Sequence, residues 1–213
     1  MKIIVFGATG KIGSLLVPEL IEAGHGVVAY VRSAEKGASL KRCGADLHVA
    51  DLEAPIDLGA LAGVDACIFT AGSGSATGKD KTLTIDLWGA IKTVRACEQA
   101  GVRRYIMVSA LKASDPDRGA EGIRPYLVAK HAADALLMAS SLDYTILRPG
   151  RLTDEPGSGQ VAAGPSLENY DGAISRANVA RALQVCLEMP GTIGKTYELL
   201  DGPTSITAAF GSS

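Results

Sequence analysis

Long hydrophobic runs, closely spaced cysteines and an excess of basic charge are all absent from this sequence. The apolar run near the N-terminus ends at Gly7, and no later segment reaches the roughly 18 uninterrupted apolar residues of a membrane-spanning helix. The formal net charge is -2, with both signs interspersed, so no basic stripe is available for nucleic-acid phosphates or an anionic membrane. We therefore expect a soluble cytoplasmic protein whose partner is a small-molecule substrate, with no nucleic acid and no membrane as partner.

Residues that bind metals or form disulfides are few and scattered. The four cysteines include no C-x-x-C pair, and three of them fall in segments with strand or helix character, which favours buried reduced thiols. The three histidines show no pair at metal-ligand spacing, so no metal site is expected. These residues are Cys43, Cys67, Cys97, Cys186, His25, His48 and His131.

Short apolar runs alternate with helical patterns along the whole chain. The runs are apolar at consecutive positions, as expected when helices cover both faces of a sheet. With 213 residues, of which 47% are hydrophobic, the chain fits one domain with a substantial core. The alternation predicts a single Rossmann-type α/β domain over 1–213, a doubly wound parallel sheet of about seven strands with helices on both faces.

The expected strands cover 2–6, 27–31, 46–50, 65–70, 104–109, 143–148 and 195–200, and the expected helices cover 11–23, 33–42, 81–100, 124–140 and 176–189. Gly24 and Gly101 follow two of these helices, at the position where a left-handed residue ends a helix. The segment 151–172 is rich in glycine and proline and poor in periodicity. We expect it to form a loop on the substrate side of the site.

The first strand is followed by the sequence FGATGKIGS, in which Gly7, Gly10 and Gly13 recur every three residues. Between a strand and a helix, such glycines allow a tight turn, close approach of a diphosphate to backbone N–H groups, and packing of the helix on the strand. A glycine-rich turn without a ligand is the alternative, but the position at the first strand–helix turn favours dinucleotide binding. The residues expected to contact the cofactor here are the three glycines with Thr9, Lys11 and Ile12.

The G-x-x-G-x-x-G spacing resembles that of extended and atypical short-chain dehydrogenases/reductases. Further segments resemble this family in the same chain order: ADL at 50–52, SA at 109–110, YLVAK at 126–130, LRPG at 147–150 and ISRANVARAL at 174–183. Together they cover nearly the whole chain. Asn178 stands where the family usually has Asp, and the short C-terminal part leaves little room for a nucleotide-sugar substrate.

The end of the second predicted strand indicates which nicotinamide cofactor binds. NAD-preferring enzymes place a carboxylate there, whereas this chain has Arg32, whose guanidinium suits the 2′-phosphate of NADP. NADP is therefore favoured over NAD, with Lys36 able to share the role. An exposed arginine without a ligand is the alternative. The other expected cofactor contacts, which rest on the resemblance, are Ser33, Asp51, Leu52, Ala71, Gly72, Ser73, Lys130, Pro149 and Gly150. Asp51 would contact the adenine, and a turn cap is the alternative role for it.

Tyr126 and Lys130 are four residues apart on a predicted helix, so their side chains emerge from one face. An adjacent ammonium would lower the pKa of the phenol and make it a better proton shuttle. By resemblance, Tyr126 would protonate the carbonyl oxygen as hydride arrives, Lys130 would also hold the nicotinamide ribose, and Ser109 would hydrogen-bond the oxygen. A surface tyrosine beside a lysine is the alternative reading of the same spacing.

The sequence therefore predicts an NADP-dependent oxidoreductase that acts on a small carbonyl, quinone-like or conjugated substrate. Two alternatives stay open: a nonenzymatic NADP(H)-sensing regulator, and an isomerase or epimerase that uses bound nicotinamide transiently. The complete set of Ser109, Tyr126 and Lys130 favours an enzyme. The sequence leaves the substrate and the oligomeric state open.

Overall fold

A nine-stranded sheet forms the centre of the computed structural model, which describes residues 1–74 and 77–211. The strand order is β11-β8-β10-β6-β5-β4-β1-β2-β3. The seven strands from β10 to β3 are parallel, and the order changes direction between β1 and β4, where doubly wound folds bind ligands. The strands are β1 (Lys2–Phe6), β2 (Gly26–Val31), β3 (Asp46–Val49), β4 (Ala66–Phe69), β5 (Arg104–Val108), β6 (Asp143–Pro149), β8 (Gln160–Gly164), β10 (Lys195–Asp201) and β11 (Thr204–Ser205).

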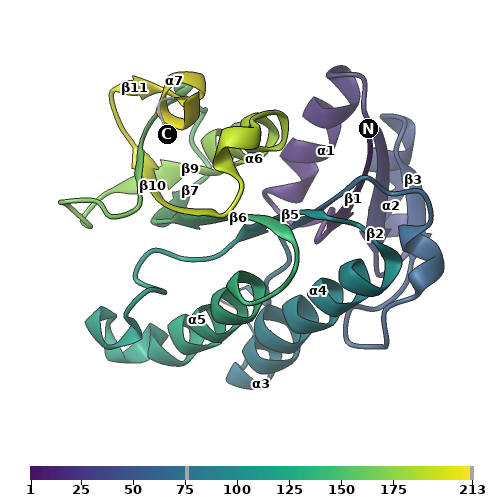
Figure 1. Ribbon diagram of the computed structural model, residues 1–213, viewed down its shortest axis with the longest axis horizontal. Coiled ribbons are helices and arrows are strands. Elements are labelled where there is room, and N and C mark those ends of the chain that lie inside the picture. The colour runs from purple at the N-terminus through teal and green to yellow at the C-terminus, as the bar shows by residue number, and fades with distance from the viewer. Residues whose placement is uncertain (75–76, 212–213) are drawn as a thin grey trace.

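Helices cover both faces of this sheet, with α1 and α6 on one side and α4 and α5 on the other (Figure 1). The helices are α1 (Gly13–Glu22), α2 (Ala34–Arg42), α3 (Lys79–Lys81), α4 (Trp88–Ala100), α5 (Arg124–Met138), α6 (Arg176–Glu188) and α7 (Ile206–Gly211). A π-helical turn, η2 (Thr82–Leu87), joins α3 to α4. Four short 3-10 helices are η1 (Leu58–Leu61), η3 (Pro116–Arg118), η4 (Glu121–Ile123) and η5 (Pro190–Thr192).

The consecutive apolar residues of β1 show why the strands have this pattern. Ile3 and Val5 belong to the core under α1 and α6, while Ile4 and Phe6 belong to the core under α4, and all four are fully buried. Successive side chains of a strand point to opposite faces, so a strand covered on both faces needs apolar residues at every position. The predicted doubly wound sheet is confirmed.

Two details of the strands differ from the sequence-based expectation. The sheet has nine strands instead of about seven, and 151–172, expected as a loop, contains β7 (Arg151–Thr153) and β8. β7 pairs with β9 (Ala173–Ser175) in a separate two-stranded sheet. β8 lies antiparallel between β10 and β11 and buries only Val161 fully, so it lacks the continuous apolar pattern of the parallel strands.

The helix expected over 81–100 is divided by the π-helical turn, where backbone hydrogen bonds join residues five apart instead of four. The composition does not change there, so the sequence gives no sign of the division. Gly24 and Gly101 have φ of 85° and 75°, as predicted for residues that end α1 and α4. Across the described ranges, no helix combines the length and the apolar character needed to cross a membrane.

Candidate functional site

Two of the three glycines between β1 and α1 are required by the packing of the protein itself. Gly7 has a φ of 83°, and a Cβ added there would lie 2.5 Å from the backbone nitrogen of Ala71 in the loop after β4. A Cβ on Gly13 would overlap the carbonyl oxygen of Gly7. These glycines let α1 and the loop after β4 approach the turn closely.

Gly10 differs, because the protein leaves space beside it. A Cβ on Gly10 would meet only the carbonyl oxygen of Gly7, at 3.1 Å, and the Gly10 N–H donates to the same oxygen at 2.9 Å. The missing side chain keeps the approach to the N-terminus of α1 open. Backbone N–H groups and the helix dipole at this end suit an anion, so the turn fits the diphosphate of a dinucleotide. Of the neighbouring predicted contacts, Thr9 and Lys11 are exposed and the Ile12 side chain is buried in the core.

Arg32 lies directly after β2 and is exposed. No carboxylate among the described residues forms an ion pair with it, so its guanidinium is available for a phosphate. Ser33 caps α2, its hydroxyl accepting from the Lys36 N–H at 3.3 Å. Asp51 accepts from the Glu53 N–H at 2.9 Å. This contact caps a turn, which was the alternative to the expected adenine contact.

The other predicted cofactor contacts lie at the carboxyl ends of the parallel strands or close to them. Ala71 packs against Gly7, and the Ser73 N–H donates to the Asp86 carboxylate at 3.0 Å. Pro149 ends β6, and its carbonyl oxygen accepts from the Leu111 N–H at 2.9 Å. Gly72 and Gly150 belong to the same two segments, whereas Leu52 is a buried core residue.

Three ionisable residues, Tyr126, Lys130 and Asp134, follow one another at four-residue intervals along α5. This spacing places them on one face of the helix. Tyr126 is half-buried, whereas the side chain of Lys130 is buried and its ammonium donates to the Val108 carbonyl at 2.7 Å. Burial lowers the pKa of Lys130.

Asp86 is a site residue that the sequence analysis missed. It lies in the π-helical turn η2 and is 1% exposed. Burial, followed by the negative charges of Asp86 and Asp134, raises the pKa of Tyr126. The expectation that Lys130 lowers this pKa is therefore wrong, because its ammonium is held on the Val108 carbonyl, while burial and two carboxylates determine the direction of the shift. A lone acidic residue in an otherwise uncharged stretch, TLTIDLWGA, was the only sign of Asp86 in the sequence.

Ser109 belongs to a buried polar group that also includes Asp134 and Arg148. The Ser109 hydroxyl donates to Asp134 Oδ2 at 2.9 Å, and Arg148 Nε donates to the same oxygen at 2.8 Å. Burial raises the pKa of Asp134, although the charge of Arg148 opposes this. The hydroxyl of Ser109 is thus bonded within the protein, and it would have to turn away from Asp134 to reach a substrate. The i+4 and i+8 spacing from Tyr126 was the signal that could have identified Asp134.

Ion pairs connect the glycine-rich turn to the segment after β7. Asp154 accepts from Lys11 Nζ at 2.6 Å and from Arg176 at 2.5 Å. The hydrogen bond from Lys11 and the charge of Arg176 lower the pKa of Asp154. Arg176 begins α6, so two cations from distant parts of the chain flank the turn where a diphosphate fits. Like Asp86 and Asp134, Asp154 and Arg176 are residues that the sequence analysis did not assign to the site.

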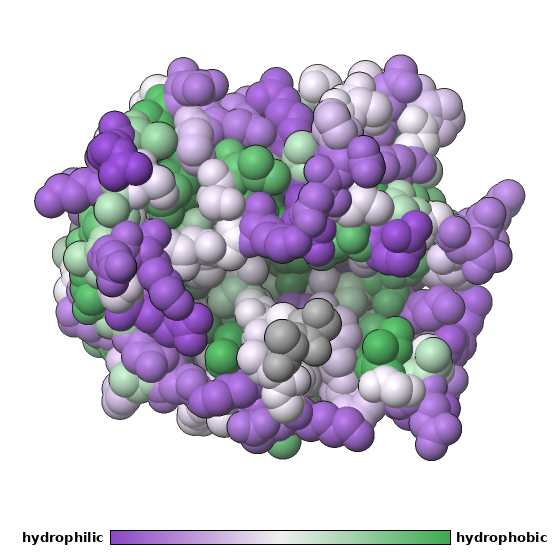
Figure 2. Space-filling view, turned by 180° about the vertical axis from the view of Figure 1, so that it is seen from behind, coloured by the Kyte–Doolittle hydropathy of each residue, from purple (hydrophilic) through white to green (hydrophobic). Residues whose placement is uncertain are grey.

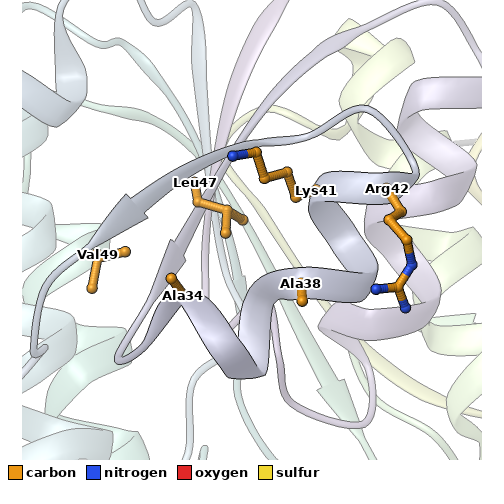
Figure 3. Close-up of a pocket in the computed structure, with 6 residues that line it drawn as sticks. All are labelled: Ala34, Ala38, Lys41, Arg42, Leu47 and Val49. Carbon is orange, nitrogen blue, oxygen red and sulfur yellow. The ribbon is translucent and has the colours of Figure 1, made fainter.

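Two hollows are visible on the surface. Seen from behind, the molecule is hollowed near its middle, with apolar residues at the bottom and hydrophilic residues around the rim (Figure 2). A separate pocket between α2 and β3 is lined by Ala34, Ala38, Lys41, Arg42, Leu47 and Val49 (Figure 3). Because β3 is the edge strand, four strands from β5 in the sheet, this pocket is separate from the residues of α5.

Within the described part of the chain, no three His, Cys, Asp or Glu side chains are grouped as a metal site would require. The four cysteines are free; Cys67, Cys97 and Cys186 are buried, and Cys43 is exposed. The expectation of reduced cysteines agrees with these positions, apart from the exposure of Cys43.

Comparisons with known proteins agree with this geometry. Residues 7–190 match the NAD(P)H-binding family. YhfK of Bacillus subtilis, described as an uncharacterized sugar epimerase, is 46% identical over 213 residues, which cover 99% of both chains. A solved structure from Bacillus halodurans, described as an NAD-dependent epimerase/dehydratase, is 45% identical with a TM-score of 0.96 over 100% of both chains. The oxidoreductase ylbE from Lactococcus lactis is 29% identical with a TM-score of 0.85, and the match covers 100% of this chain and 96% of that one. The chain therefore belongs to the NAD(P)H-binding family and is an atypical short-chain dehydrogenase/reductase-like protein.

Proposed function

We propose that this protein is an NADPH-dependent reductase that transfers hydride to a small carbonyl, quinone-like or conjugated substrate. The observation that carries the proposal is the position of the half-buried Tyr126 on the same helix face as the buried Lys130. A phenol placed beside a reacting carbonyl can donate its proton to the oxygen as that oxygen gains negative charge. The four free cysteines support a reducing, cytoplasmic location for this activity.

The cofactor would bind across the carboxyl edge of the sheet. Its diphosphate would meet the turn around Gly10, its 2′-phosphate would meet Arg32, and the loop at Ala71 to Ser73 and the Pro149–Gly150 segment would flank the nicotinamide half. When bound, the reduced nicotinamide would supply the hydride. The protein would hold it in place and limit the access of water to the reacting atoms.

Tyr126 would donate its proton to the carbonyl oxygen. Burial, followed by the carboxylates of Asp86 and Asp134, opposes phenolate formation in the free chain, so the proton stays on Tyr126 until a stronger base, the developing alkoxide, lies beside it. Lys130 would hold the nicotinamide ribose, as the resemblance implies, if its ammonium left the Val108 carbonyl. Ser109 remains a candidate to bond the substrate oxygen, and Asp134 competes for its hydroxyl.

An isomerase that uses nicotinamide transiently is the second candidate, because YhfK is described as a sugar epimerase. A screen of carbonyl and quinone compounds that follows NADPH absorbance separates the two. We expect oxidation of NADPH in step with product. Product without any net change in absorbance would support the isomerase, and cofactor binding without any turnover would support a sensor.

Preference for NADP is tested with Arg32→Ala. Loss of a charge-assisted contact costs about 1.5–3 kcal/mol, so we expect NADP(H) to bind more weakly by roughly tenfold to a hundredfold while NAD(H) binding hardly changes. Lys36→Ala serves as the comparison for a neighbouring cation. Equal weakening for both cofactors in Arg32→Ala would remove Arg32 from phosphate recognition.

A further inference from the structure

Two cations in the segment after β5 lie over one aromatic ring from another loop. Lys112 Nζ is 5.9 Å and the Arg118 guanidinium carbon 4.8 Å from the centre of the Tyr170 ring. Tyr170 belongs to the connection between β8 and β9. The segment after β5 thus places two positive charges against a ring that lies about 50 residues later in the chain.

Both segments are fixed to parts of the proposed active site. Lys112 lies three residues after Ser109, and its neighbours are anchored on each side: the Leu111 N–H donates to the Pro149 carbonyl, and the Ala113 carbonyl lies 2.8 Å from His131 Nδ1. His131 directly follows Lys130 on α5. Lys112 is therefore held between the segment that ends β6 and the helix that carries Tyr126.

The other loop is anchored on β10. The buried carboxylate of Glu198 accepts from the Leu167 N–H at 2.8 Å and from the Tyr170 hydroxyl at 3.5 Å. Glu198 is paired in register with Arg148 on β6. Since β6 and β10 are parallel neighbours, the loop that carries Tyr170 is anchored on the strand next to β6, which ends in Pro149.

Lys112 also has an unusual backbone. Its φ is 70°, and no other non-glycine residue in the described ranges has a positive φ. A lysine in the left-handed region costs free energy, and such strain occurs most often at functional sites.

Neither Lys112 nor Arg118 forms an ion pair with any described carboxylate, whereas other cations near the site do. Lys11 and Arg176 are paired with Asp154, and Arg148 with Asp134. On the same segment, Asp117 pairs with Arg124, and the exposed Asp115 and Glu121 make no ion pair with either cation. Two positive charges without an ion-pair partner beside the proposed substrate site suit an anion, since arginine binds a carboxylate with its planar fork and lysine adds a point charge.

We propose that Lys112 and Arg118, positioned by Tyr170, form a carboxylate-binding subsite, so that the substrate is a carbonyl compound with a carboxylate group. This inference rests on the proposed reductase function for the identity of the reacting group. The anionic group would fix the orientation of the carbonyl relative to Tyr126. It would also make the enzyme discriminate against neutral carbonyl compounds of the same shape.

The test compares 4-formylbenzoate with its methyl ester, two aldehydes that differ in charge. We expect wild-type kcat/KM to be higher for the acid by roughly tenfold or more, because a charge-assisted hydrogen bond contributes about 1.5–3 kcal/mol. Lys112→Met and Arg118→Gln should each lower kcat/KM for the acid by roughly tenfold and leave the ester unchanged. The matched control is Arg95→Gln, since Arg95 lies 5.6 Å from the Trp88 ring on α4, away from this loop. The control should change neither value.

Binding of 4-formylbenzoate, followed by calorimetry, separates the subsite from the reductase. If the wild-type chain binds the acid and Lys112→Met and Arg118→Gln do not, the carboxylate-binding subsite is supported. This conclusion holds even when no aldehyde is reduced, and in that case only the proposed reductase function is contradicted. Equal losses for acid and ester would mean that the cations only pack on Tyr170. No preference of the wild-type chain for the acid, in binding or turnover, would overturn the subsite.

Discussion

Tyr126 combines two properties that rarely occur together in an ordinary surface tyrosine. It is half-buried, and burial, followed by the charges of Asp86 and Asp134, raises its pKa. The two carboxylates disfavour the phenolate, so the phenol keeps its proton in the free chain. The proposed role of Tyr126 rests on its position one turn before Lys130 on the same face of α5.

Tyr126→Phe should therefore separate catalysis from binding. The substitution keeps the ring and removes the hydroxyl, so cofactor affinity should change little while kcat falls by about 10²–10⁴-fold. Tyr144→Phe, which alters another partly buried tyrosine, is the control and should leave kcat unchanged. An undiminished kcat for Tyr126→Phe, when chemistry limits the rate, would mean that the proton comes from solvent.

Ser109 is predicted to contribute to stability as well as to the site. Ser109→Ala removes a buried hydrogen bond to Asp134 and leaves that carboxylate with Arg148 alone. We expect the free energy of unfolding to fall by about 1–3 kcal/mol, measured by denaturant titration. Ser141→Ala, which removes an exposed hydroxyl bonded to Glu98, should change it by less than about 0.5 kcal/mol. If both variants lower the free energy of unfolding by the same small amount, the Ser109 hydroxyl is not bonded to Asp134 in solution.

The glycine-rich turn contains one glycine that the fold does not require. Gly10→Val should leave a folded protein, since a Cβ at this position meets only one backbone oxygen, but it should abolish cofactor binding by filling the space of the diphosphate. Circular dichroism and cofactor titration measure the two effects. Gly13→Ala is the contrasting variant and should destabilise the fold, because its Cβ would overlap Gly7. Unchanged cofactor affinity in Gly10→Val would reduce the turn to a structural role.

Asp154 holds Lys11 and Arg176, two cations that flank the same turn. Asp154→Asn should release both cations and strengthen cofactor binding by a few-fold, with a steeper dependence on salt. The pKa of Asp154 is lowered in the folded chain, so its ion pairs are complete above the unfolded pKa near 3.8 and are lost as pH falls through the lower folded value. Cofactor titrations at neutral pH test the release. Weaker binding in Asp154→Asn would mean that Asp154 positions the two cations for the cofactor.

The sequence predicted the sheet, its parallel order and the turn at Gly7 to Gly13, because these depend on local composition and on the regular alternation of strands and helices. It did not predict β8 or the π-helical turn, since both depend on contacts with distant segments. Spacing in the sequence led to the predictions for Arg32 and for the Tyr126–Lys130 pair, whose roles stay predictions. Asp86 was missed because its environment arises only when η2 packs against α5. The predicted direction of the Tyr126 pKa shift was wrong for the same reason. Burial and residues that are distant in the sequence but close in space determine this shift, and Lys130 does not.

At the scale of the whole molecule, the fold would position two groups for one reaction. A cofactor bound at the sheet edge would donate the hydride, and Tyr126 would donate the proton. The most direct test uses NADPH deuterated at C4 of the nicotinamide with 4-formylbenzoate, and mass spectrometry of the alcohol. The account predicts one deuterium in each alcohol molecule from one diastereomer of the labelled cofactor, with one NADP formed per product. If the carbonyl compounds of the screen are tried in turn and bound NADPH transfers deuterium to none of them, the claim that this protein is a reductase is contradicted.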